Sequence, residues 1–339
     1  MPTINLVLWD NGVGLRRDME ILRDAWRAAG CDVFVSARRR GTLHKWLAPW
    51  RLKARMARQR FGGRDRLGRF DVNVMLEHIR PEHLDLAKRN VLIPNPEWFL
   101  EENRALLDRI DLVLVKTRHA QQQFDSLGVR TRFVGFTSID RRMQEQKRKA
   151  FFHLAGRSRH KGTEELLRIW RKHPEWPDLT VLQHPRMAKQ CVKAPNIDHR
   201  IGYISDAELK RLQNSHLFHL CPSETEGFGH YIVEAMSVGA IVLTLDAPPM
   251  NELVKPDRGV LLPYERTGTH GLSMTYHFGE RGLQQAVVEA LSLDDARCGA
   301  LQANARRWFE ENDKSFRLRL TESLPLEDAD WHNDASLRP

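Results

Sequence analysis

The chain alternates apolar runs with helical patterns, and this alternation constrains its fold more than any other feature. An apolar run at residues 4–9 is followed by the glycine stretch DNGVG, a helical pattern from about Leu15 to Ala29 and a second apolar run at 31–36. The first half then contains further apolar runs, at 70–76, 90–94, 111–117 and 131–136. Strands that alternate with helices in this way predict a parallel sheet covered by helices.

The same rhythm begins again at about residue 150, after a charged stretch at 140–149. Strands are predicted there by apolar runs at 150–156, 179–184, 216–221, 241–246 and 259–263. Helical patterns follow most of these runs. We therefore expect an α/β protein with two Rossmann-like domains, over 1–145 and 146–312. Because ligands bind at the carboxyl ends of parallel strands, we expect the two domains to face a central cleft.

The composition, with 41% apolar residues in 339, is that of a globular protein with a sizeable core. No run approaches the 18 or so apolar residues of a spanning helix, and the first residues read as a strand rather than a signal peptide. The fifteen histidines include no HExxH or similar spacing, so we expect no metal site. The scattered cysteines are interpreted as reduced core residues of a cytosolic protein: Cys31, Cys191, Cys221 and Cys298.

The net charge of +9 is concentrated in residues 38–69, here called the basic segment. It contains 12 Lys and Arg residues and one acid, Asp65. Ten of the 12 are arginines, and aromatic residues are interleaved with them. The first domain is therefore expected to bind an anionic acceptor. The expected contacts are Arg38, Arg39, Arg40, Lys45, Trp50, Arg51, Lys53, Arg55, Arg58 and Arg60.

A glycine loop with two glutamates, ETEGFGHYIVEAM, follows the strand expected at 216–221. Glycines allow close backbone approach to a ligand, and the N-terminus of the following helix offers free N–H groups to an anion. Glu226 lies at this loop. Seven residues separate it from Glu234, which is therefore about two helical turns away. A nucleotide sugar would span both carboxylates. The alternative is a capped helix with one buried and one exposed acid.

Three motifs resemble glycosyltransferase family 4, the glycosyl transferases group 1, in the order that this family has. They are HLAGRSRHKGTEELLRIW, IGYISDAELKRLQNSHLFHLCPS and ETEGFGHYIVEAMSVGAIVLTLD followed by DRGVLLP. The resemblance covers about 150 residues of the second half and is looser in the first. It implies a GT-B fold and a retaining, metal-independent hexosyltransferase. It also implies a helix at 313–322 that returns to the first domain, before a tail at 323–339.

The resemblance further implies which residues bind a nucleoside-diphosphate sugar such as UDP-glucose, with no other cofactor. Glu226 contacts the donor sugar, and Glu234 holds the ribose. Arg157 and Lys161 bind the diphosphate, and each also has the simpler interpretation of a solvated loop cation. Further expected donor contacts are Gly12, Gly14, Tyr203, Ile204, Gly227, Phe228, Gly229 and His230. The alternative for His230 is a surface histidine at the start of the helix.

In the mechanism usually proposed for this family, the departing phosphate takes the proton of the acceptor, so no protein base is required. Fixed cations would then stabilise the leaving group. The first-domain candidates for assisting catalysis are Glu77, His78, Asn95 and Glu97. The stretch PNPEW departs from the family pattern, so Glu97 is read either as a base or as the cap of the following helix.

Three interpretations of the basic segment stand at this point. The first and slightly favoured one is a DNA-binding surface, with the sugar transferred to a hydroxymethylated base. The second is a peripheral-membrane surface with a glycolipid, lipopolysaccharide or polysaccharide precursor as acceptor, although the cations spread around most of a helix. The third is a basic surface without a specific role. We expect a cytoplasmic enzyme without an obligate protein partner; a regulator that binds nucleotide sugars without turnover is the alternative from another class.

Overall fold

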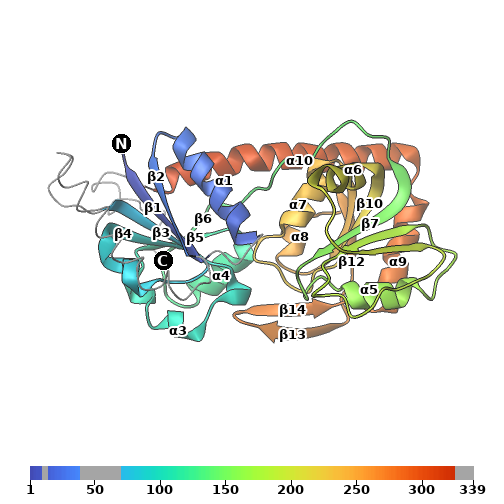
Figure 1. Cartoon of the computed structure of the whole chain (residues 1–339), viewed down its shortest axis with the longest axis horizontal. Coiled ribbons are helices and arrows are strands. Elements are labelled where there is room, and N and C mark those ends of the chain that lie inside the picture. Colours follow the sequence, from blue (N-terminus) through green and yellow to red (C-terminus); the bar gives the residue numbers. More distant parts are fainter. Residues whose placement is uncertain (10–13, 39–69, 325–339) are drawn as a thin grey trace. The chain divides into compact units, whose positions relative to one another are not determined.

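The computed structural model describes residues 1–9, 14–38 and 70–324 (Figure 1). The chain divides into two compact units. The first unit comprises Met1–Gly135 and the C-terminal residues from Ser315, and the second comprises Phe136–Lys314. Each unit is built around one parallel sheet of six strands.

The sheet of the first unit has the order β2-β1-β3-β4-β5-β6. Its central strands are buried on both faces, as expected of a parallel sheet between helical layers. Helix α1 (Gly14–Ala28) covers it with Leu15, Met19, Leu22 and Trp26, which recur at helical spacing. The strands are β1 (Thr3–Trp9), β2 (Asp32–Arg38), β3 (Phe70–Leu76), β4 (Ala87–Ile93), β5 (Leu112–Val115) and β6 (Thr131–Phe133).

The sheet of the second unit has the order β12-β11-β10-β7-β8-β9, and all of its strands are parallel. The chain starts in the middle of this sheet at β7, winds outward through β8 and β9, and returns to β10 on the other side. The strands are β7 (Arg148–Gly156), β8 (Leu179–Gln183), β9 (Ile197–Ile201), β10 (His216–Cys221), β11 (Ile241–Leu245) and β12 (Gly259–Leu262). The point of reversal between β7 and β10 is where open α/β sheets bind ligands.

The helices of the second unit follow its strands as a Rossmann-like topology requires. They are α5 (Thr163–Trp170), α6 (Asp206–Ser215), α7 (His230–Ser237), α8 (Met250–Leu253) and α9 (Glu280–Ser292). Between β12 and α9 the chain forms an antiparallel hairpin of β13 (Arg266–His270) and β14 (Ser273–His277). This hairpin was not predicted, because β13 is polar and half exposed and so lacks the apolar alternation that signals a strand.

Helix α10 (Asp295–Glu322) is continuous, whereas a separate helix was expected only at 313–322. Neither proline nor glycine interrupts residues 300–322, so nothing in the sequence ends the helix earlier. Its residues up to Lys314 belong to the second unit, where Arg306 binds Asp140 at 2.8 Å. Its residues from Ser315 belong to the first unit, where Arg319 donates to the carbonyl of Val134 at 2.9 Å.

The charged stretch at 140–149 packs against α6 of the second unit. Arg141 is buried, and its guanidinium donates to Gln213 at 2.9 Å and to Asp206 at 2.8 Å. The cysteines are all free, but only Cys221 and Cys298 are buried; Cys191 is exposed, so the expectation of four core cysteines was wrong there. Within the described residues, no helix is long and apolar enough to cross a membrane.

Two buried histidines form hydrogen bonds between strands and neighbouring segments of the second unit. The Nδ1 of His153 donates to the carbonyl of Leu220 at 2.8 Å, and its Nε2 accepts from the hydroxyl of Thr163 at 2.8 Å. The Nδ1 of His216 donates to the carbonyl of Leu212 at 2.8 Å. Burial lowers the pKa of each imidazole to about 4. Both rings therefore act as neutral hydrogen-bonding groups in the folded protein.

These pKa values predict that the protein loses stability as the solution becomes acidic. Below about pH 6.5 the unfolded chain binds protons at both histidines, whereas the folded chain does so only near pH 4. The free energy of unfolding should thus fall as pH drops through this window, by about 1.4 kcal/mol per pH unit and per histidine. Urea unfolding of the parent and of His153→Gln at about pH 7 and about pH 5 measures this. Equal pH dependence in the two proteins would contradict the assignment.

Candidate functional site

The loops that follow β7 and β10 meet at the reversal point of the second sheet. Lys161 lies in the β7–α5 loop (residues 157–162), and Glu226 lies in the β10–α7 loop (residues 222–229). Their side chains form a direct ion pair and are only about one-seventh exposed. Two residues from separate sequence motifs, both predicted to bind the donor, are thus brought together by the fold.

Two further side chains, which the sequence analysis did not single out, complete this ion pair. The Oγ of Ser223 lies 2.5 Å from both the carboxylate of Glu226 and the hydroxyl of Tyr231. The ammonium of Lys161 lies over the Tyr231 ring, 3.6 Å from its centre. Burial raises the pKa of Tyr231 well above its ordinary value, so the phenol stays neutral beside the carboxylate.

The glycine loop ends at Gly229, and α7 begins at His230, directly after EGFG, as the sequence indicates. Gly229 is the N-cap of α7 and has a φ of 107°, a left-handed conformation that glycine adopts readily. Because the helix starts at His230, Glu234 lies about one turn into it. Gly227 and Phe228 are buried in the loop. A Cβ at position 229 would approach Leu253 to 3.1 Å, which adds a packing reason for glycine.

Glu234 is 2% exposed and accepts hydrogen bonds through both of its carboxylate oxygens. Its Oε1 accepts from the hydroxyl of Ser138 at 3.3 Å, and its Oε2 accepts from the amide of Gln213 at 3.2 Å. The same Ser138 hydroxyl lies 3.1 Å from Nδ1 of His230, which places that predicted residue beside Glu234. Sequence reasoning missed both partners. Ser138 lies outside the three motifs, and Gln213 lies within the second motif but was given no role.

The residues expected to read the nucleotide base lie just after β9. Tyr203 is 78% exposed, and its hydroxyl lies 2.6 Å from Nε2 of His184, at the end of β8. His184, which was not predicted, is thus joined to the predicted loop, where Ile204 is half-buried. Arg157 is exposed in the β7–α5 loop, and no described residue forms an ion pair with it. A guanidinium in this condition is available to an anion.

In the first unit, polar side chains gather where β3, β4 and β5 end. Lys116 follows β5, and its ammonium donates to Asp18 of α1 at 2.5 Å and to Asn95, after β4, at 2.9 Å. The amide of Asn95 donates in turn to Glu77, after β3, at 3.4 Å. Burial raises the pKa of Glu77. A chain of hydrogen bonds therefore links two buried carboxyl groups through one cation.

Glu77 has a φ of 69°, which is uncommon for a residue with a side chain and is often found at functional positions. Its carboxylate lies 3.5 Å from Nε2 of His78, whose pKa is lowered by burial. Glu97 is buried in a short 3-10 helix, η2 (Pro96–Trp98). The N-cap of the next helix, α3 (Glu101–Arg104), is Leu100, so Glu97 does not cap it as one reading proposed.

Several predicted residues lie outside the described part of the chain. Gly12 is one of them, whereas Gly14 is the first residue of α1. Of the basic segment, only Arg38 is described, at the end of β2. The expected acceptor contacts Arg39, Arg40, Lys45, Trp50, Arg51, Lys53, Arg55, Arg58 and Arg60 all fall outside. In the described residues, no group of three His, Cys, Asp or Glu side chains is arranged to hold a metal ion.

Comparison with known proteins agrees with the motifs. Residues 135–267 match the family model of the glycosyl transferases group 1, and this region contains Lys161, Glu226 and Glu234. A search of curated protein sequences gives no match.

Solved structures of glycosyltransferases have the same fold. Sucrose-phosphate synthase from Thermosynechococcus elongatus matches with a TM-score of 0.67 at 15% identity, over 95% of this chain and 98% of that one. A structure described as trehalose-6-phosphate from E. coli bound with UDP-2-fluoro glucose gives 0.61 at 11%, over 95% and 100%. A lipopolysaccharide outer core galactosyltransferase gives 0.59 at 12%, over 95% and 100%. The expected fold class, two Rossmann-like domains of the GT-B type, is confirmed.

The buried ion pair of the first unit predicts an asymmetric response to mutation. Lys116→Met should destabilise the protein by about 3–5 kcal/mol, because it leaves the buried carboxylate of Asp18 without its cation. The double variant Asp18→Leu/Lys116→Met should recover much of this loss, since both charges are then gone. Denaturant unfolding of the three proteins measures the effect. A double variant less stable than Lys116→Met would show that the pair is not the cause.

Proposed function

We propose that this protein transfers a sugar from a nucleoside-diphosphate sugar to a hydroxyl group of an anionic acceptor. The observation that carries the proposal is the Lys161–Glu226 ion pair. It joins two loops at the reversal point of the second sheet, beside a glycine loop that leads into the N-terminus of α7. The match of this region to the glycosyl transferases group 1 supports it.

In this proposal the donor lies along the two loops. Arg157 and Lys161 bind the diphosphate, together with backbone N–H groups at Gly227, Phe228 and Gly229. His230 lies beside them. Glu226, released from Lys161, accepts hydrogen bonds from hydroxyls of the donor sugar. Glu234 exchanges the neutral hydroxyl of Ser138 for a ribose hydroxyl, so its burial is kept without a change in charge. Tyr203, Ile204 and their backbone contact the base.

The reaction breaks the bond between the anomeric carbon and the diphosphate oxygen and forms one to the acceptor oxygen. The electron pair of the broken bond stays with the diphosphate, where Arg157 and Lys161 stabilise the developing charge. The acceptor oxygen attacks from the face that the diphosphate leaves, so the sugar retains its anomeric configuration, and the departing phosphate oxygen takes the proton of the acceptor hydroxyl. Arg157 and Lys161 supply the charge that a metal ion would otherwise provide. Gly12 and Gly14 are further proposed donor contacts, and His78 and Glu97 are the residues proposed to assist at the acceptor hydroxyl.

The acceptor is proposed from the charge of the basic segment, 12 cations against one acid. The DNA base slightly favoured from the sequence has no support from the similar structures described above. Their descriptions name sugar phosphates and lipopolysaccharide. A phosphorylated saccharide or glycolipid is therefore the acceptor class that we put forward, and DNA becomes one arm of the test.

The donor assignment predicts that Lys161 is needed for binding of nucleoside diphosphates. Lys161→Gln should weaken UDP binding about tenfold or more, since a charge-assisted hydrogen bond contributes about 1.5–3 kcal/mol. Lys172→Gln is the matched control, because Lys172 is an exposed lysine just beyond α5 that pairs with Glu280. Titration calorimetry with UDP compares the parent with both variants. Equal affinities for the parent and Lys161→Gln would remove the diphosphate site from this loop.

Turnover is tested by release of nucleoside diphosphate from a panel of nucleotide sugars. Each donor is mixed with a sugar phosphate, anionic vesicles carrying lipopolysaccharide, hydroxymethylcytosine DNA or unmodified DNA. Release should require one anionic acceptor and should fall about 100-fold in Glu226→Gln. Release only with hydroxymethylated DNA would restore the DNA reading. Tight UDP binding without turnover in any arm would favour a regulator over an enzyme.

A further inference from the structure

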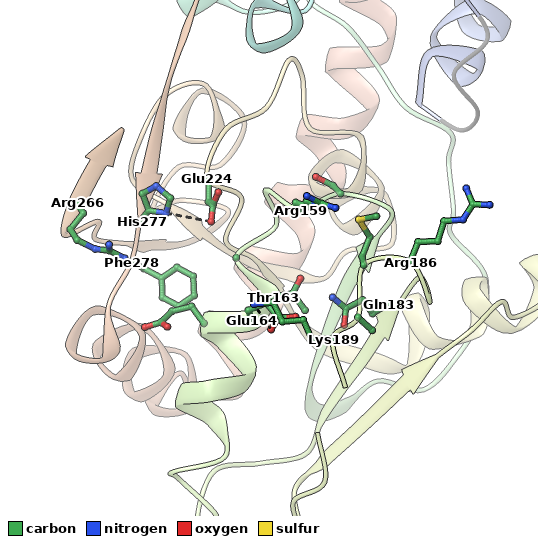
Figure 2. Close-up of a pocket in the computed structure, with 15 residues that line it drawn as sticks. Arg159, Thr163, Glu164, Gln183, Arg186, Lys189, Glu224, Arg266, His277 and Phe278 are labelled. Atoms are coloured by element: carbon green, nitrogen blue, oxygen red, sulfur yellow. Dashed lines mark ion pairs between the residues drawn. The ribbon is translucent and has the colours of Figure 1, made fainter. Parts of the chain in front are cut away.

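A cavity of about 560 Å³ lies within the second unit and is distinct from the proposed donor site (Figure 2). Its walls are the β7–α5 loop with the start of α5, the loop after β8, and the hairpin β13–β14. Arg157, Lys161, Glu226 and Glu234 do not line it. Ser158 and Arg159 do, and so does Glu224, two residues before Glu226.

Each carboxylate that lines the cavity already has a cationic or histidine partner. Glu165 binds Arg168 at 2.6 Å, and Glu164 lies 3.7 Å from Lys189. Glu224 bridges His160 at 3.1 Å and His277 at 3.3 Å, and the second of these contacts is drawn in Figure 2. The negative charge of the walls is therefore largely engaged by the protein itself.

Three arginines at the cavity, in contrast, have no carboxylate partner in the described part of the chain. Arg159, Arg186 and Arg266 come from three different loops or strands, and all three are exposed. No carboxylate of the described residues lies within ion-pair distance of their guanidinium groups. Guanidinium groups that line one cavity and have no carboxylate partner are available to a ligand with phosphate oxygens, which fit the planar fork of arginine.

An amide also lines the cavity. Gln183, the last residue of β8, is 4% exposed. The Nδ1 of His199 accepts from the backbone N–H of Val192 at 3.1 Å, so Nε2 carries the hydrogen and donates to Oε1 of Gln183 at 3.0 Å. This contact fixes the orientation of the amide. Its NH₂ group has no acceptor among the described residues and is available to a ligand in the cavity.

We propose that this cavity is a second ligand site of the protein, for a small phosphorylated molecule such as a sugar phosphate. The arginines bind the phosphate, the Gln183 amide donates to an oxygen of the organic part, and Met187 and Phe278 contact its apolar surface. The volume lies in the range of small-molecule sites. The proposal does not depend on the donor assignment, because the two sets of residues do not overlap.

The hairpin makes this site part of the same structural unit as the donor loops. The backbone N–H of Tyr276 in β14 donates to the carbonyl of Glu224 at 2.8 Å, and the N–H of Glu224 donates to the carbonyl of His160 at 2.9 Å. Gly162 has a φ of 65°, and a Cβ there would lie 2.7 Å from the carbonyl oxygen of Pro222 and 2.8 Å from the Phe278 ring. One wall of the cavity is thus the back of the loops that hold Lys161 and Glu226.

Calorimetric titration of the full chain with glucose 6-phosphate tests the proposal. UDP is added first in excess, so that any diphosphate site elsewhere is filled. The double variant Arg159→Gln/Arg266→Gln should weaken glucose 6-phosphate binding at least tenfold. The control Arg171→Gln/Arg211→Gln removes two exposed arginines of the same unit outside the cavity, with the same change in net charge, and should bind like the parent.

A second variant tests the amide without removing a cation. Gln183→Glu keeps an acceptor for His199 but replaces the NH₂ group with a carboxylate oxygen, so binding should fall at least tenfold while the unfolding temperature stays near that of the parent. Three results would overturn the proposal: no binding by the parent, equal binding by the cavity and control double variants, or equal binding of glucose and glucose 6-phosphate. Because UDP affinity is measured separately in every variant, failure of the donor assignment would be recognised independently.

Discussion

The Lys161–Glu226 ion pair is the contact on which the candidate site depends. It joins loops from strands that lie next to each other in the sheet but far apart in the sequence, at the point where the winding of the chain reverses. The hydroxyl of Ser223 contacts the carboxylate of Glu226, and the ring of Tyr231 contacts the ammonium of Lys161. These two side chains fix the positions of both charges of the pair. The glycine loop and the start of α7 are positioned by the same contacts. A diphosphate that takes Lys161 therefore changes the partner of Glu226 at the same moment.

The two glutamates of the glycine-loop motif make different contacts. Glu226 is paired with the Lys161 ammonium, and the donors to Glu234 include a hydroxyl and an amide. A sugar hydroxyl can replace a neutral donor with little electrostatic cost, but it cannot neutralise a carboxylate. Under the proposed function, a ribose hydroxyl replaces the Ser138 hydroxyl as a donor to Glu234. Glu226 needs several donors at once, which a hexose with adjacent hydroxyls supplies.

The sheets were predictable because their central strands are short apolar runs, buried on both faces and separated by helical patterns. The meeting of Lys161 with Glu226 was expected only through the family resemblance. Contacts between residues distant in sequence gave no local signal: Ser138 reaches Glu234, and Asp18 reaches Lys116, through the tertiary fold alone. The start of α7 at His230 agrees with the sequence, because the glycines of EGFG favour a loop before the helix. The hairpin was missed because β13 is polar.

Gly162 also bears on how this protein can be engineered. Its hydrogen faces the carbonyl of Pro222 and the ring of Phe278, so three segments of the second unit share a point that no larger residue can occupy. The far end of the hairpin is different, because Gly271 at its turn is exposed. Added residues or a reporter label are therefore expected to be tolerated at the tip and not at the root. A label at the tip would follow the hairpin without disturbing the junction that ties it to the glycine loop.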